Sequence, residues 1–182
     1  TASAPLIIGA DGTHSRVREL AGLRTRDWSY MQDAIVGTVA LDTAHQSACW
    51  QVFLPTGPLA LLPLADSKLA ALVWSIDEPL CKEIIALSDE RFIGFINESL
   101  ERSAPSVIAV GSRASFPLRQ CHAVDYVGDG LVLVADAAHN IHPLAGQGIN
   151  LGLTDAKVLV EELIAAKSGG LPLASSVPLK RY

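Results

Sequence analysis

The sequence has 182 residues, of which 49% are hydrophobic and 18% charged, with a formal net charge of −5. This composition excludes a disordered chain and is typical of a globular protein with a buried core in one or two domains. The negative charge and the lack of a Lys/Arg run argue against nucleic acid as a partner. The three cysteines are far apart and form no C-x-x-C pair, so neither a disulfide framework nor a zinc site is expected, and the reducing cytoplasm is the expected compartment.

The two ends of the sequence bear on its completeness. No run approaches the roughly 20 apolar residues that span a bilayer, and the first residues lack the features of a signal peptide. The chain begins with Thr1 rather than Met and enters an apolar run almost at once. We therefore interpret it as a fragment of a longer protein.

The amino-terminal residues predict a strand, a tight turn and a short helix. Residues 5–8 are an apolar run, residues 9–12 read Gly-Ala-Asp-Gly, and residues 15–21 have helical composition before Gly22.

The residue pattern changes between residues 35 and 76, where apolar or β-branched runs are separated by Pro, Gly, Asp and Ser. This pattern predicts strands of a mainly antiparallel sheet. The four runs are residues 35–41, 48–54, 59–64 and 69–76. Apolar residues at helical spacing then predict helices over residues 79–87 and 89–100, with Ser88 capping the second.

The last third of the chain returns to an α/β pattern. Strands are predicted around residues 115–118 and over residues 131–135, where a nearly continuous apolar run is typical of a buried parallel strand. A long helix follows and ends at Gly169-Gly170. Its apolar positions are expected on one side: Leu153, Ala156, Val160, Leu163 and Ile164.

The strongest candidate site follows the apolar run of residues 131–135. The predicted strand presents Asp136 at its carboxyl end, where ligands bind in open α/β sheets and where a carboxylate can hold a ribose hydroxyl. Gly146 and Gly148 allow the backbone to approach a flat ligand, and the start of the next helix favours anionic groups. An ordinary strand–loop–helix connection, with glycines serving only packing, is the alternative interpretation.

Asp11 occupies an equivalent position after the first predicted strand. The chain therefore has two acidic corners, each followed by a helix. The alternative interpretation of Asp11 is that Asp11-Gly12 only forms a turn and binds no ligand.

Two motifs in this order resemble a known family. Residues 9–18, Gly-Ala-Asp-Gly-Thr-His-Ser-Arg-Val-Arg, resemble the second fingerprint of the class A flavoprotein monooxygenases, and residues 135–139, Ala-Asp-Ala-Ala-His, resemble their third. Between them, residues 27–36, 50–64 and 73–75 resemble the ubiquinone-biosynthesis hydroxylase subgroup. The resemblance covers essentially the whole chain, but the family's first fingerprint, G-x-G-x-x-G, and its carboxyl-terminal portion are absent from this sequence.

The resemblance implies an α/β fold: part of a Rossmann-like FAD-binding domain, residues 1–26 and 113–182, with an inserted, mainly antiparallel sheet and helices that form the substrate domain, residues 27–112. It implies FAD as cofactor and NAD(P)H as co-substrate. It assigns cofactor contacts to the following residues: Asp11, Gly12, Arg16, Asp136, Pro143, Ala145, Gly146, Gln147, Gly148, Ile149 and Asn150. No catalytic side chain is assigned.

The reaction implied by the resemblance is hydroxylation of an aromatic, polyprenylated phenol or quinol with NAD(P)H and O2, in ubiquinone biosynthesis. The expected partners are this substrate, O2, other ubiquinone-biosynthesis proteins and the surface of the inner membrane. A flavin enzyme with a different substrate remains open. So does a catalytically incomplete fragment that serves as a binding or assembly module.

Several other residues are of types found in metal sites or catalytic motifs, but the sequence around them does not form a complete motif. His139 and His142 are three apart, but no further ligand is spaced to complete a metal site. No G-x-S-x-G elbow supports a hydrolase. His45, Cys49 and Trp50 are expected to pack within the insert.

Overall fold

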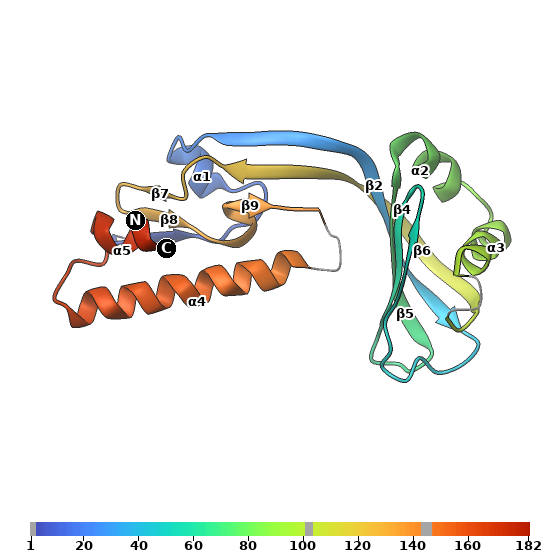
Figure 1. Cartoon of the computed structure of the whole chain (residues 1–182). Helices are drawn as coiled ribbons and strands as arrows, with labels where there is room; N and C mark the ends of the chain where they lie inside the picture. Colours follow the sequence, from blue (N-terminus) through green and yellow to red (C-terminus); the bar gives the residue numbers. More distant parts are fainter. Residues whose placement is uncertain (1–2, 101–103, 143–146) are drawn as a thin grey trace. The chain divides into compact units, whose positions relative to one another are not determined.

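Two long strands, β2 (Thr25–Leu41) and β6 (Val107–Ala123), connect two compact parts of the chain. The computed structural model describes residues 3–100, 104–142 and 147–182. Residues 1–28 and 119–182 form the first unit, and residues 29–118 form the second (Figure 1). Both boundaries fall inside the two long strands, as do the boundaries expected after residues 26 and 112.

The first unit contains a sheet of three short strands. Its order is β1 (Ile7–Gly9), β8 (Leu131–Leu133) and β7 (Val127–Gly128). β1 pairs with β8 in parallel, with Ile8 opposite Val132, so their carboxyl ends meet at one edge. All three residues of β8 are buried, which confirms the predicted buried parallel strand.

Short elements surround this sheet at its carboxyl edge. β1 leads into α1 (Arg16–Leu20), and β8 leads into the 3-10 helix η1 (Ala135–Ala137) and β9 (His139–Asn140). Two further helices complete the unit: α4 (Gln147–Ser168) and α5 (Ser176–Arg181).

The long helix α4 was predicted correctly, but the side on which it packs was not. Its buried positions are Gly152, Leu159 and Ala166, seven residues apart, and they therefore lie on one face. Leu159 packs in a cluster with Val132, Val134 and Leu179. Of the predicted stripe, Leu163 joins this cluster, whereas the following side chains are exposed: Leu153, Ala156, Val160 and Ile164. The prediction followed side-chain size, whereas the packed face includes small residues that bring the helix close to the sheet.

The second unit is built on an antiparallel sheet. β3 (Trp50–Leu54), β4 (Gly57–Pro63) and β5 (Leu69–Asp77) pair in sequence, and β5 also pairs with β2. The full sheet order is β3-β4-β5-β2-β6-β9. The four predicted strands are confirmed. β2 starts earlier than expected because residues 25–33 lack a buried side chain and therefore show no hydrophobic alternation.

One face of this sheet is covered by α2 (Glu78–Ile85) and α3 (Asp89–Leu100), which Figure 1 shows beside it. On α3, every fourth residue is buried: Phe92, Ile96 and Leu100. Arg91 donates its backbone N–H to the predicted cap, Ser88 Oγ, at 3.4 Å. None of the helices in the described part of the chain is long and apolar enough to cross a bilayer.

Candidate functional site

A cavity of about 730 Å³ opens at the carboxyl edge of the parallel pair β1 and β8. Its volume lies within the range of roughly 300–1,000 Å³ that is usual for small-molecule and cofactor sites. Four segments line it: the turn after β1, the turn after β8, β9 with the residue that follows it, and the first turns of α4. The lining residues are Ala10, Gly12, Val134, Ala135, Asp136, Asn140, Ile141, Gly148, Ile149, Gly152, Leu153 and Ala156.

Asp136 is the acidic residue of this cavity. It lies in η1, immediately after β8, and its side chain is partly buried. Within the described residues its carboxylate takes part in no hydrogen bond or ion pair, so both oxygens can accept hydrogen bonds from a ligand. The structure therefore places a carboxylate with hydrogen-bonding capacity where the sequence predicted one.

Asp11 lies beside the cavity but uses its carboxylate within the protein. The carboxylate accepts hydrogen bonds from the Ser15 hydroxyl and from the backbone N–H groups of Arg16, at 2.8 Å, and Val17, at 3.1 Å. These bonds, above all that from Ser15, hold the pKa of Asp11 below its ordinary value. Asp11 therefore fixes the turn that starts α1. The adjacent Gly12, which lines the cavity, has a φ of +83°, a conformation that favours glycine.

The two arginines of the first motif have different environments. Arg16 forms an exposed ion pair with Glu19 at 2.7 Å and does not line the cavity. The guanidinium of Arg18 is partly buried and donates to the carbonyl oxygens of Thr13 and Ala137, both at 2.8 Å. Arg18 therefore connects the turn after β1 to the turn after β8, a role that the sequence did not indicate.

The start of α4 forms a further wall of the cavity. Gly148 and Ile149 line the cavity, whereas Gln147 and Asn150 are exposed and do not. An added Cβ at Gly148 would meet no atom of the described residues within 4 Å, so this glycine borders open space. Three other residues predicted from the sequence lie outside the described residues: Pro143, Ala145 and Gly146.

Helix α4 also touches the turn after β8. A Cβ at Gly152 would lie 2.6 Å from the Cβ of Ala135, so only glycine allows this close approach. One turn later, Asp155 Oδ2 accepts the backbone N–H of Ala135 at 2.8 Å and contacts His139 Nε2 at 2.6 Å. Asp155 was missed at the sequence level, because a single Asp in an amphipathic helix carries no signal.

His139 and His142, the two histidines that follow β8, lie in buried or partly buried positions. His139 is buried, and its ring lies 5.7 Å from that of Tyr126. Burial lowers the pKa of His142. Among the residues that the structure describes, no group of three His, Cys, Asp or Glu side chains could hold a metal ion.

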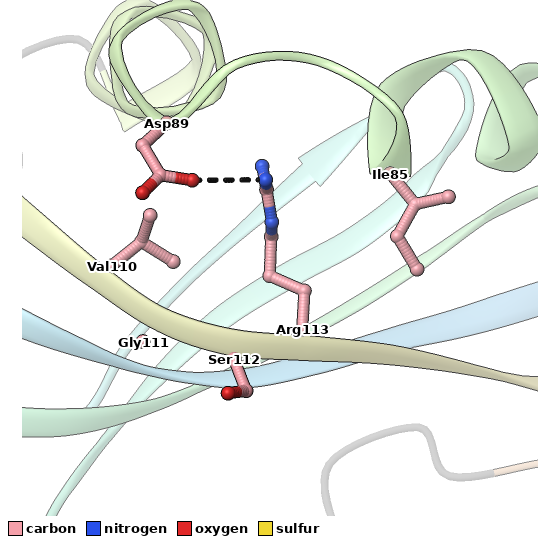
Figure 2. A pocket seen from close by; sticks show the side chains of 6 residues that line it. All are labelled: Ile85, Asp89, Val110, Gly111, Ser112 and Arg113. Carbon is pink, nitrogen blue, oxygen red and sulfur yellow. Dashed lines mark hydrogen bonds and ion pairs between the residues drawn. The ribbon is translucent and has the colours of Figure 1, made fainter.

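A second cavity, of about 560 Å³, lies in the second unit between the helices and β6 (Figure 2). Its cationic residue, Arg113, is engaged by the protein: it pairs with Asp89 at 3.0 Å, donates to the Leu87 carbonyl at 3.0 Å and lies over the Phe92 ring. We therefore assign Arg113 to holding the α2–α3 connection against the sheet.

The fold and the first cavity together define the class of the protein. A parallel strand pair with an acidic residue after each strand, and a glycine-containing helix start facing the same cavity, is the arrangement of α/β domains that bind nucleotide cofactors. Residues 1–174 match the profile of the FAD binding domain family, and the chain belongs to this family.

Individual relatives agree with this assignment. The chain is 38% identical to ubiquinone biosynthesis monooxygenase COQ6, mitochondrial, from Mus musculus, over all of this chain and 45% of the relative. It is 40% identical to 3-demethoxyubiquinol 3-hydroxylase from Escherichia coli strain K12, over 98% of this chain and 45% of the relative. The chain thus spans about half the length of the curated relatives that it matches.

Solved structures show the same fold. A probable FAD-dependent monooxygenase of Pseudomonas aeruginosa, pqsL, superposes with a TM-score of 0.78 at 24% identity, over 98% of this chain and 50% of that one. The p-nitrophenol 4-monooxygenase PnpA of Pseudomonas putida superposes with a TM-score of 0.71 at 23% identity, over 97% and 44%. The predicted α/β fold class and the resemblance to FAD-dependent monooxygenases are confirmed.

Proposed function

We propose that the chain is part of an FAD-dependent monooxygenase that hydroxylates the aromatic ring of a polyprenylated phenol or quinol in ubiquinone biosynthesis. NAD(P)H is the electron donor and O2 the oxygen donor. Two relatives support this proposal. One, named for ubiquinone biosynthesis, is 38% identical over the whole chain, and the other, named 3-demethoxyubiquinol 3-hydroxylase, is 40% identical over 98% of the chain.

The observation that carries the proposal is the cavity at the carboxyl edge of β1 and β8. It combines a carboxylate with hydrogen-bonding capacity, Asp136, with a wall of glycine and apolar residues. A ribose hydroxyl suits the carboxylate, and a flat ring suits the wall formed by Gly148, Ile149 and Gly152. These features fit FAD.

In this proposal each predicted residue has a physical role. Asp136 accepts a hydrogen bond from the ribose, and the N–H groups at the start of α4, from Gln147 to Asn150, favour the electron-rich edge of the flavin ring. Gly12 gives the ligand access beside the turn that Asp11 shapes, and Arg16 offers an exposed positive charge to NAD(P)H. Pro143, Ala145 and Gly146 lie outside the described residues, and the sequence resemblance alone assigns them to the cofactor.

The chemistry of oxygen transfer belongs to the flavin when it is bound. This chain's residues bind and orient the cofactor and keep water from the ring through apolar side chains such as Ile149 and Leu153. We propose that residues 27–112 bind the aromatic substrate, and that its polyprenyl tail brings the protein into peripheral contact with the inner membrane and with other ubiquinone-biosynthesis proteins.

FAD titration of the chain tests the proposal directly. The visible absorbance and the fluorescence of FAD are followed as the chain is added, for the wild type and for Asp136→Ala. Asp129→Ala is the matched control, because Asp129 is exposed and lies away from the cavity. We expect saturable binding that weakens by about 10-fold or more in Asp136→Ala, as for a lost charged hydrogen bond, and an unchanged control.

A longer version of the protein extends the test to activity. It should consume NAD(P)H in the presence of a polyprenylphenol and form the hydroxylated product. If the longer version binds FAD and the 182-residue chain does not, the chain is a catalytically incomplete part of the enzyme. Hydroxylation of a different aromatic ring would support a related flavin enzyme with another substrate. Failure of both versions to bind FAD would contradict the flavin assignment.

A further inference from the structure

One oxygen of Asp155 holds two groups of the turn after β8. Oδ2 accepts the backbone N–H of Ala135 at 2.8 Å and lies 2.6 Å from His139 Nε2. The side chains of His139 and Asp155 are 7% and 13% exposed, so both contacts are largely shielded from water. Asp155 itself does not line the cavity, so it contacts no ligand bound there.

The turn that Asp155 holds has an unfavourable backbone conformation. Ala135 has a φ of +53°, in the left-handed region that residues with a Cβ adopt at a cost. A strained residue persists when its surroundings determine its conformation. Here the Asp155 carboxylate binds the Ala135 N–H, and the absence of a side chain at Gly152 leaves room for the Ala135 Cβ.

Asp136 follows Ala135 directly, so the Ala135 conformation sets the direction in which the Asp136 carboxylate leaves the backbone. At the other end of the turn, His139 is fixed by the same Asp155 oxygen. The backbone of residues 135–139 is therefore held at both ends by one side chain from α4.

We propose that Asp155 is a positioning residue for the cofactor: it fixes the left-handed turn at Ala135 and thereby directs the Asp136 carboxylate into the cavity. This inference rests on the proposed function for the identity of the ligand. The claim that Asp155 fixes the backbone at Ala135 concerns the chain without a ligand and does not depend on the identity of the ligand. Asp155 acts through Ala135 and Asp136 and touches neither cofactor nor substrate.

Three variants of the chain separate this role from a general contribution to stability. Asp155→Ala removes both contacts. Asp155→Asn keeps an oxygen that can accept from the Ala135 N–H and from a protonated His139 Nε2. Glu161→Gln is the matched control, because it removes one negative charge from an exposed position of the same helix.

Two measurements are made on each variant: amide hydrogen exchange by NMR without ligand, and FAD affinity by titration. In Asp155→Ala we expect exchange at Ala135 to rise and FAD affinity to fall, each by about 10-fold or more, as for loss of a shielded hydrogen bond to a charged group. Exchange at Leu133, whose N–H binds the Tyr126 carbonyl, should not change. Asp155→Asn should recover most of the affinity, and Glu161→Gln should match the wild type.

Gly152→Ala provides a second route if Asp155→Ala does not fold. Alanine favours the helix, but its Cβ would lie 2.6 Å from that of Ala135 and displace the turn while Asp155 is intact. Because Gly152 itself lines the cavity, the measurement on this variant is amide exchange at Ala135 without ligand, and we expect a stable helix with faster exchange. Unchanged exchange at Ala135 in this variant would contradict the proposal.

The outcomes distinguish the inference from the proposed function. Unchanged Ala135 exchange in Asp155→Ala overturns the inference, as does faster exchange with unchanged FAD affinity, which would make the pair purely structural. A wild type that binds no FAD contradicts the proposed function. In that case Ala135 exchange still decides whether Asp155 holds the turn.

Discussion

The guanidinium of Arg18 donates a hydrogen bond to the carbonyl oxygen of Ala137 at 2.8 Å. The two residues are 119 positions apart, and each belongs to one of the two sequence motifs. The same guanidinium donates to the Thr13 carbonyl at 2.8 Å. Arg18 therefore binds the two turns at the cavity together, which explains why both motifs occur in one site.

We predict that Arg18→Ala lowers the free energy of unfolding by about 2 kcal/mol, because two carbonyl oxygens lose a charged donor. Arg16→Ala should change it by less than about 0.5 kcal/mol, since its ion pair with Glu19 is exposed. Urea denaturation followed by circular dichroism measures both. Equal effects of the two substitutions would contradict the role assigned to Arg18.

Some residues of the candidate site could be predicted from the sequence, and others could not. Asp136 was predicted because it follows a continuous apolar run, and Gly148 because glycines mark close backbone approach. Asp155 and Arg18 could not be predicted in the same way. Their partners are backbone groups of distant turns, and the pairing depends on how the chain folds.

The same limit applies to the fold. The strands of the second unit were predicted because they are apolar or β-branched runs separated by Pro, Gly, Asp and Ser. In the structure, buried residues such as Leu72 and Trp74 alternate along β5. The first half of β2 was missed because its residues are mostly exposed and are kept in the strand by backbone pairing. The packed face of α4 was missed because Gly152 and Ala166 bury little apolar area.

Asp11 predicts a specific dependence of stability on pH. Its pKa in the folded chain is below the ordinary value of 3.8, first because of the Ser15 hydrogen bond. A carboxylate whose pKa is lowered in the folded chain stabilises the fold at pH values above its ordinary pKa. This stabilisation is lost as the pH falls through the pKa of the folded chain. We therefore expect Asp11→Asn to be less stable than the wild type at neutral pH, with a difference that narrows below about pH 4.

The measurement is the urea midpoint of both proteins from neutral to acidic pH. Asp129→Asn is the control, because this exposed carboxylate takes part in no hydrogen bond within the described residues. Its urea midpoint should match that of the wild type at neutral pH. A difference for Asp11→Asn that does not vary with pH would show that its charge contributes nothing to the turn.

The three cysteines should differ in reactivity. Cys49 is exposed, whereas Cys81 and Cys121 are buried. Burial, together with the neighbouring Asp27, raises the pKa of Cys121 to about 11, so its thiolate fraction near pH 8 is about a thousandth. We expect iodoacetamide to modify Cys49 rapidly and the other two only after unfolding, as read by mass spectrometry. Cys49→Ser should abolish the rapid reaction, and rapid labelling of Cys121 would contradict the buried position of β6 at this residue.

Tyr182 connects the last described helix to the buried strand β8. Its hydroxyl donates to the Leu133 carbonyl at 2.9 Å. Burial raises its pKa well above the ordinary value of 10.0, and the nearby Asp155 charge adds to this. Tyr182→Phe removes the donor and should cost about 1 kcal/mol of unfolding free energy at neutral pH.

The pH dependence provides a second, independent reading of the same residue. Because the folded pKa of Tyr182 is raised, its stabilisation is complete below pH 10 and is lost as the pH rises above that value, where the unfolded chain loses the phenol proton first. The wild type should therefore lose stability between about pH 10 and 11 more steeply than Tyr182→Phe. Urea midpoints over this range measure the difference. Parallel curves for the two proteins would mean that the Tyr182 hydroxyl is in contact with water rather than bound to Leu133.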